Sequence, residues 1–217
     1  MADEMTMDRY LDAFKDLCSN YLGIYYNSQT LFNNHPEYFS EEMRNVVTES
    51  LAVKIFAQWE NFLQHIFIEY MLGRKSENGS LAKRYVFPND AEHAYNMIKN
   101  VNSFPEWADV EKVLINANNF FEDYGPFKIL KTTKSEINAL RKIRNAIAHT
   151  SMKSVEDFEK IVRGNVGYLP DGITPAIYLI EYKSGKRKKD PNWFEYYIDH
   201  LKNVAEILVH YEAYEEE

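Results

Sequence analysis

The segment IRNAIAHTS, residues 143–151, holds three side chains whose types and spacing suit chemistry on a phosphate group. Arg144 carries a guanidinium that stays charged at neutral pH and can bind phosphate oxygens through paired hydrogen bonds. His149 carries an imidazole, which can take up or return a proton near neutral pH. Asn145 can position a phosphate or orient the histidine. These three residues are therefore the candidate catalytic group, and their chemistry requires no metal.

The same residues also fit an ordinary solvated helix end, because basic side chains near a helix C-terminus interact favourably with the helix dipole. Successive residues turn by about 100° around a helix, so Asn145 and His149 share a face while Arg144 and His149 diverge by about 140°. The two can meet if the helix ends near Ala148, if the arginine reaches around, or if a second copy of the helix supplies the partner. A symmetric cleft with two histidines and two arginines suits cleavage of RNA by its own 2′-hydroxyl, a group that DNA lacks.

The elements that must position these residues are helices, because apolar residues recur at helical spacing along most of the chain. The long helices are predicted at residues 8–31, 41–72, 134–150 and 191–214. Ser40 is the expected cap of the second, and Thr133 with Glu136 forms a T-x-x-E capping box for the third. Ser154 offers a similar start for a further helix. We expect the last long helix to pack on the second.

Two segments interrupt this pattern. Residues 80–132 predict a helical insertion with short helices. Residues 163–190 predict a loop, a short strand over AIYLIEYKSG (176–185) and a basic turn, because β-branched and aromatic residues favour strands. The expected fold class is therefore all-α, with residues 1–217 as a single domain and a short strand or hairpin near the C-terminal helix.

Composition allows one sizeable core, since 45% of the 217 residues are hydrophobic and 15% are aromatic. The net charge of −8 argues against a protein that coats nucleic acid non-specifically, because such proteins neutralise phosphates with an excess of basic residues. One local basic run can still guide RNA by its field, although a solvated turn has the same composition. Its members, the candidate RNA-binding residues, are Lys183, Lys186, Arg187, Lys188 and Lys189.

The sequence lacks the signals that identify several other classes of protein. The single cysteine, Cys18, excludes an intramolecular disulfide framework, and no stretch has the pattern of a signal peptide. We therefore expect a cytoplasmic protein. The apolar segment 50–72 contains too many polar residues to span a bilayer and is predicted to be a core helix, so no membrane partner is expected. Since H-E-x-x-H, P-loop, G-x-G-x-x-G and G-x-S-x-G motifs are also missing, neither a metal site nor a cofactor is predicted.

The hexapeptide RNAIAH, residues 144–149, resembles the R-x4-H signature of HEPN domains (higher eukaryotes and prokaryotes nucleotide-binding), in which a polar residue follows the arginine. The surrounding helices resemble those of HEPN ribonucleases from prokaryotic toxin and defence systems. The resemblance implies an up-and-down helical bundle that dimerises around the motif, and a metal-independent endoribonuclease. Arg144, Asn145 and His149 match the signature. Some family members carry a modified tyrosine two residues after the histidine, where this chain has Ser151.

The resemblance extends to AQWENFLQHIF, residues 57–67, which is similar to the second helix of the HEPN bundle. Family members often hold a polar residue near the cleft on that helix, and Glu60 is the candidate supporting residue here. The resemblance thus implies a cytoplasmic homodimer that cuts RNA as a toxin–antitoxin or antiphage effector and is held in check by a cognate inhibitor or sensor protein. One alternative is a catalytically inactive HEPN dimer that binds RNA or protein as a scaffold. Another is a small-ligand-binding bundle with a deep apolar pocket between the first two helices.

Overall fold

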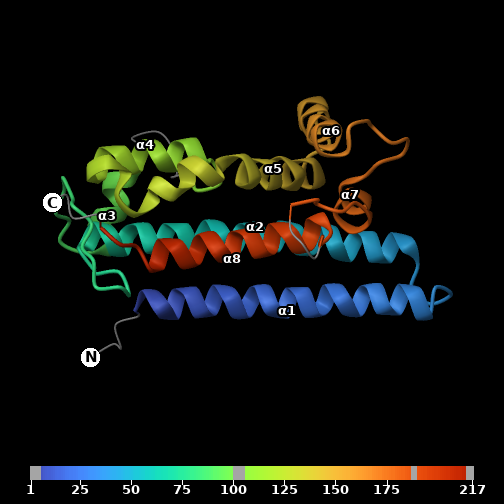
Figure 1. Ribbon diagram of the computed structural model, residues 1–217, viewed down its shortest axis with the longest axis horizontal. Coiled ribbons are helices and arrows are strands. Elements are labelled where there is room, and N and C mark those ends of the chain that lie inside the picture. The colour runs from blue at the N-terminus through green and yellow to red at the C-terminus, as the bar shows by residue number, and fades with distance from the viewer. Residues whose placement is uncertain (1–5, 100–105, 187–189, 214–217) are drawn as a thin grey trace. The chain divides into compact units, whose positions relative to one another are not determined.

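A computed structural model describes residues 6–99, 106–186 and 190–213 of the chain (Figure 1). The elements are α1 (Met7–Asn34), α2 (Glu41–Leu72), α3 (Ala91–Ile98), α4 (Val110–Phe120), the 3₁₀ helix η1 (Glu122–Ile129), α5 (Leu130–Ala148), α6 (Met152–Val166), α7 (Pro175–Glu181) and α8 (Trp193–Val209). The all-α fold class is therefore confirmed for these residues, whose only β-type pairings are isolated bridges. Within them, no helix has the length and apolarity needed to cross a bilayer.

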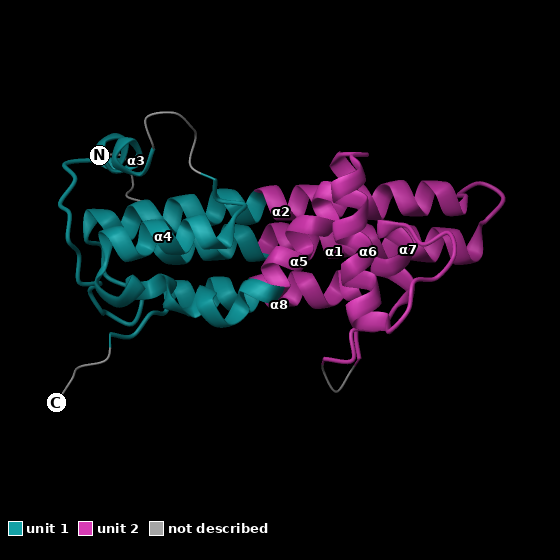
Figure 2. Ribbon diagram, turned by 90° about the horizontal axis from the view of Figure 1, so that it is seen from above, with its two compact units in different colours: residues 1–15, 58–135, 202–217 teal, residues 16–57, 136–201 magenta. Residues whose placement is uncertain are grey.

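The chain divides into two compact units, each built from separate stretches of sequence (Figure 2). Unit 1 comprises residues 1–15, 58–135 and 202–217, and unit 2 comprises residues 16–57 and 136–201. Helices α1, α2, α5 and α8 contribute residues to both units. The candidate catalytic residues all belong to unit 2. The single-domain organisation stays a prediction.

The core of unit 1 is organised around the C-terminal half of α2. Trp59, Leu63 and Phe67 are fully buried at helical spacing, which confirms the prediction of a core helix. The Tyr70 hydroxyl donates to the backbone oxygen of Leu208 at 2.6 Å, which joins α2 to α8. Within unit 1 the last helix thus packs on the second, as expected.

The helical character expected for residues 80–132 is confirmed by α3 and α4, and each helix has an aspartate cap. The Asp90 carboxylate accepts from the backbone N–H of His93 at 2.8 Å. The Asp109 carboxylate accepts from the N–H of Glu111 at 3.0 Å. Such caps satisfy amides that have no partner inside the first helical turn.

The expected capping box of Thr133 and Glu136 is wrong. The 3₁₀ helix η1 leads directly into α5, which already begins at Leu130. The Thr133 hydroxyl donates back to the backbone oxygen of Ile129 at 3.1 Å. Because threonine inside a helix commonly bonds the carbonyl one turn earlier, it does not cap the helix here.

The expected strand over residues 176–185 is also wrong, because most of that segment forms α7. The Thr174 hydroxyl accepts from the backbone N–H of Ile177 at 3.2 Å, and Pro175 occupies the first turn, where proline favours a helix. These start signals outweigh the β-type composition. Of the expected hairpin, the described residues contain a single antiparallel bridge between Lys183 and Asn192.

The start of α8 in unit 2 depends on Asn192, which is buried. Its side-chain oxygen accepts from the backbone N–H of Glu195 at 3.0 Å, and the Glu195 carboxylate accepts from the N–H of Asn192 at 3.2 Å. This reciprocal pair is a capping box. The Asn192 amide also donates to the Tyr25 hydroxyl at 2.8 Å. Burial raises the pKa of Tyr25, so the hydroxyl stays neutral and the bond couples α1 to the start of α8.

We expect Asn192→Ala to lower the free energy of unfolding by about 2 kcal/mol, because it removes a cap and leaves the Tyr25 hydroxyl without its buried partner. Urea denaturation followed by circular dichroism measures the loss. In a Tyr25→Phe background, the loss of unfolding free energy caused by Asn192→Ala should be about 1 kcal/mol smaller. Asn20→Ala, at an exposed position of α1, is the control and should change stability by under about 0.6 kcal/mol. Equal losses of unfolding free energy for Asn192→Ala and Asn20→Ala would contradict the role of Asn192 as the cap of α8 and the partner of Tyr25.

Candidate active site at the α5–α6 turn

Helix α5 ends at Ala148, immediately before the exposed His149. The backbone N–H of His149 still donates to the backbone oxygen of Asn145 at 2.9 Å, so the histidine is held at the helix end. Ser151 caps α6, which begins at Met152. The chain therefore turns sharply within a few residues, and α6 runs crosswise to the end of α5 (Figure 1, Figure 2).

Two serines fix this turn. The Ser151 hydroxyl accepts from the backbone N–H of Ser154 at 3.3 Å, which makes Ser151 the N-cap of α6. The buried Ser154 hydroxyl lies 2.7 Å from the backbone oxygen of His149 and 2.8 Å from that of Ser151, and can donate to either. The prediction that Ser154 caps the helix is therefore wrong. Its hydroxyl can instead supply a donor to the His149 carbonyl, just beyond the end of α5.

An open cavity of about 430 Å³ lies at this turn, and we call it the His149 pocket. Its lining residues are Arg141, Lys142, Asn145, His149, Ser151, Lys153, Ser154 and Asp157. Three of these side chains are cationic and one is a carboxylate, so the lining is basic although the chain carries a net charge of −8. A basic pocket with hydroxyl, amide and imidazole groups suits an anionic ligand such as a phosphodiester.

The structure brings two of the three candidate catalytic residues together. Asn145 and His149 both line the His149 pocket, whereas Arg144 does not. The half-buried Arg144 guanidinium donates from Nη1 to Oδ1 of Asn145 at 3.1 Å. Its Nε is buried and has no hydrogen-bond partner among the described residues. Arg144 is therefore hydrogen-bonded to a residue of the pocket without lining it, in agreement with the helical geometry that directs it away from His149.

Four charged residues of the pocket were not among the sequence candidates. Arg141 and Lys142 precede His149 by eight and seven residues, which places them within about 80° of it around the helix. Their spacing from His149 could therefore have identified both residues from the sequence. Lys153 and Asp157 come from α6, and only the sharp turn between α5 and α6 brings them to the pocket.

The other candidate residues lie outside the His149 pocket. Glu60 is half-buried on the part of α2 that belongs to unit 1. Lys183 and Lys186 are exposed and do not line the pocket. The rest of the basic run, residues 187–189, falls outside the described residues. The roles expected for Glu60 and the basic run stay predictions.

Comparisons with models of protein families, with characterised proteins and with solved structures found no match to this chain. The HEPN resemblance thus stays one of a short motif in its helical setting. Within the part of the chain that the structure describes, no group of three His, Cys, Asp or Glu side chains could hold a metal ion. A function for this chain therefore has to be inferred from the chemistry of the His149 pocket.

Ser154→Ala should loosen the turn, because it leaves the His149 carbonyl without its buried donor. We expect a loss of about 1–2 kcal/mol in unfolding free energy. Hydrogen exchange should also accelerate at the first amides of α6. Exchange at the amides in the middle of α5 should change only as far as the loss of unfolding free energy requires. Ser50→Ala, at an exposed position of α2, is the matched control and should stay within about 0.5 kcal/mol of the parent. Unchanged exchange at the start of α6 would show that the hydroxyl does not hold the turn.

Proposed function

We propose that this chain is a metal-independent endoribonuclease of the HEPN type. The observation that carries the proposal is the basic pocket at the α5–α6 turn, where His149 and Asn145 lie with three cationic side chains. An imidazole supplies proton transfer near neutral pH, and cationic side chains supply binding and charge stabilisation for a phosphodiester. This inventory supports RNA as the substrate, since RNA provides its own nucleophile in the 2′-hydroxyl.

In the proposed reaction, a histidine acting as general base takes the proton from the 2′-hydroxyl. The 2′-oxygen then attacks the adjacent phosphorus, and the bond from phosphorus to the 5′-oxygen breaks. A second proton donor protonates the leaving 5′-oxygen, so the products are a 2′,3′-cyclic phosphate and a 5′-hydroxyl. Cationic groups around the phosphate stabilise the charge that builds on its oxygens in the transition state. The Arg144 guanidinium supports this role directly or by orienting Asn145.

The proposal requires a homodimer, because one pocket offers a single imidazole for two proton transfers. A twofold axis near the motif would bring two copies of His149 and Arg144 to one substrate phosphate. One imidazole then acts as base and the other as acid. A second chain also provides the cationic group that a single α5 directs away from its own histidine.

An RNA-cleaving enzyme harms its host unless it is controlled. We therefore propose a cytoplasmic effector of a toxin–antitoxin or antiphage system, with a cognate inhibitor or sensor protein as partner. Ser151 occupies the position of the modified tyrosine of some family members, and here it caps α6. Control through a modification at that position is therefore not proposed for this chain.

One observation favours a second candidate function. Arg144 does not line the His149 pocket and is bonded to its neighbour Asn145. A catalytically inactive HEPN dimer that uses the basic pocket to bind RNA or protein would have the same arrangement. Such a scaffold would bind RNA with a salt dependence set by Arg141, Lys142 and Lys153 but leave the RNA intact.

Purified protein incubated with total RNA in chelator should release fragments with 2′,3′-cyclic phosphate ends. We expect His149→Ala to lower the cleavage rate by at least about 100-fold, because it removes the proton-transfer group. Arg144→Ala should lower it by about tenfold or more. The controls are His35→Ala and Arg163→Ala, which remove exposed side chains that do not line the pocket and should retain full activity. Intact RNA bound with a steep salt dependence would favour the scaffold.

The dimer can be tested through its concentration dependence. Light scattering coupled to size exclusion should report twice the mass of the 25.6 kDa chain. On dilution through the dissociation constant, cleavage activity per chain should fall in parallel with the dimer fraction, because each reaction needs two imidazoles. Full activity per chain in a monomeric sample would refute the two-chain site.

A further inference from the structure

A second cavity, of about 440 Å³, lies in unit 1 between α4, η1 and the start of α5, and we call it the Tyr124 pocket. Its lining residues are Glu111, Leu114, Ile115, Asn118, Asn119, Tyr124, Lys131 and Lys134. The residues that carry the HEPN resemblance contribute none of these side chains. The volume is within the range of about 300–1,000 Å³ that small-ligand sites occupy.

One wall of the Tyr124 pocket is a face of α4. Leu114 is buried and Ile115 is 59% exposed, so the wall presents an apolar surface. Asn118 and Asn119 follow one turn later on the same face and are exposed. Asparagine amides offer both a donor and an acceptor, which is the combination that the edges of nucleobases require.

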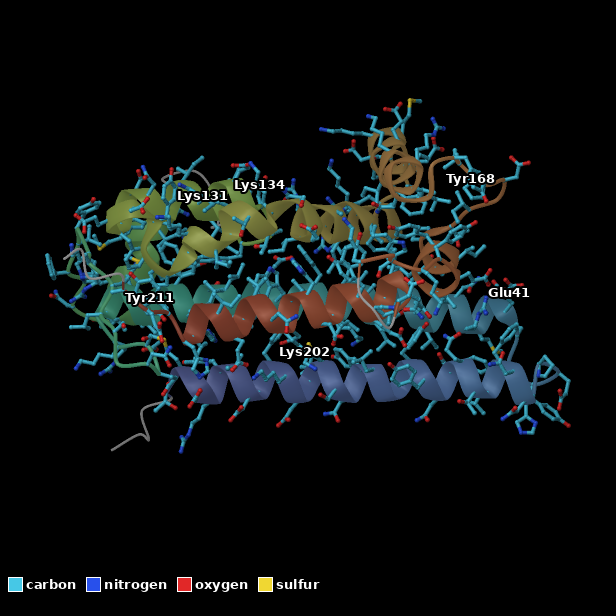
Figure 3. All side chains as sticks on the ribbon, in the orientation of Figure 1. Glu41, Lys131, Lys134, Tyr168, Lys202 and Tyr211 are labelled. Atoms are coloured by element: carbon cyan, nitrogen blue, oxygen red, sulfur yellow. The ribbon has the colours of Figure 1, made fainter. Side chains whose placement is uncertain are left out.

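The opposite wall carries two lysines of α5, both of which are labelled in Figure 3. Lys131 Nζ lies 3.3 Å from the centroid of the Tyr124 ring. Lys134 Nζ lies 2.7 Å from a carboxylate oxygen of Glu111, and both side chains are about half exposed. A surface pair of this kind contributes little to stability, so an incoming anion can compete for the lysine.

The tyrosine is presented by an unusual backbone turn. Asp123, Tyr124 and Gly125 have φ values of 45°, 67° and 48°, which lie in the left-handed region. A non-glycine residue there costs on the order of 1–3 kcal/mol, and such strain concentrates at ligand sites. Glycine suits position 125 because of its positive φ. It is also needed there because a Cβ at Gly125 would lie 3.0 Å from Cβ of the buried Phe121. The turn therefore fixes the ring beside the cavity at a cost in stability.

We propose that the Tyr124 pocket binds a nucleotide. The phosphate lies at the two lysines, and the base lies on the apolar wall beside the tyrosine ring, with the asparagine amides at its edge. Apolar, aromatic, amide and cationic groups together match the parts of a nucleoside phosphate, whereas inorganic phosphate would use the lysines alone and a nucleoside would leave them without a ligand. The proposal is independent of RNA cleavage at the His149 pocket.

Isothermal titration of the full chain with AMP, GMP, CMP and UMP in chelator tests this site. At least one of them should bind with a dissociation constant below about 1 mM, and its nucleoside and inorganic phosphate should each bind at least about tenfold more weakly. Lys131→Ala/Lys134→Ala should weaken binding by about tenfold or more. The matched control is Lys83→Ala/Lys112→Ala, which removes two exposed lysines of unit 1 that do not line the pocket and should stay within about twofold of the parent.

Photo-crosslinking locates the site directly. The azido derivative of the tightest nucleotide should label peptides that contain residues 111–119 or 124–134. Lys142→Ala in the His149 pocket should leave both the titration and the labelling unchanged, which separates this site from the proposed nuclease. The proposal is overturned by an absence of saturable binding up to about 5 mM, by equal losses in the two double variants, or by labelling elsewhere.

Discussion

The candidate active site depends on the sharp turn of the chain between α5 and α6, and that turn depends on one buried hydroxyl. Ser154 is within hydrogen-bond distance of the backbone oxygens of His149 and Ser151, while Ser151 caps the new helix. A helix end leaves carbonyls without partners, and a helix start leaves amides without partners. Ser154 can donate to a carbonyl beyond the end of α5, and Ser151 accepts from an amide at the start of α6. The histidine is thereby held at a helix end, exposed and beside the first turn of α6.

The position of this turn also decides the electrostatics of the pocket. Arg141 and Lys142 project from the last turns of α5, and Lys153 is added from α6. In an acidic chain, such a concentration of positive charge needs a local cause, and here the cause is the convergence of two helix ends. Asp157 lowers the positive charge of the lining, and it also lies 3.7 Å from Lys160. A phosphodiester would meet a cationic pocket on a chain whose net charge disfavours non-specific binding, so binding would favour this site.

Helix periodicity in the sequence was enough to predict the all-α class, the Ser40-capped second helix and its burial, because those features follow from local spacing. The Ser40 hydroxyl does accept from the backbone N–H of Met43 at 3.3 Å. The start of α5 was missed because η1 runs into it, which no capping residue reveals. The composition of residues 176–185 favours a strand, but the helix start signal at Thr174 and Pro175 outweighs it. The contribution of α6 to the pocket required the tertiary turn, which the sequence does not specify by itself.

The divergence of Arg144 from His149 is the feature that separates the functional alternatives. It follows from their five-residue separation on one helix, and the turn at His149 does not bring Arg144 into the pocket. Within one chain, the Arg144 guanidinium is hydrogen-bonded to Asn145 and does not line the pocket. A cleavage mechanism that needs a guanidinium at the phosphate must then take it from Arg141 or from a second chain. Arg141 already lines the pocket, so the need for a dimer rests mainly on the second imidazole. Because the proposed nuclease and the proposed scaffold are both dimers, the fate of the bound RNA, cleaved or intact, decides between them more directly than the stoichiometry does.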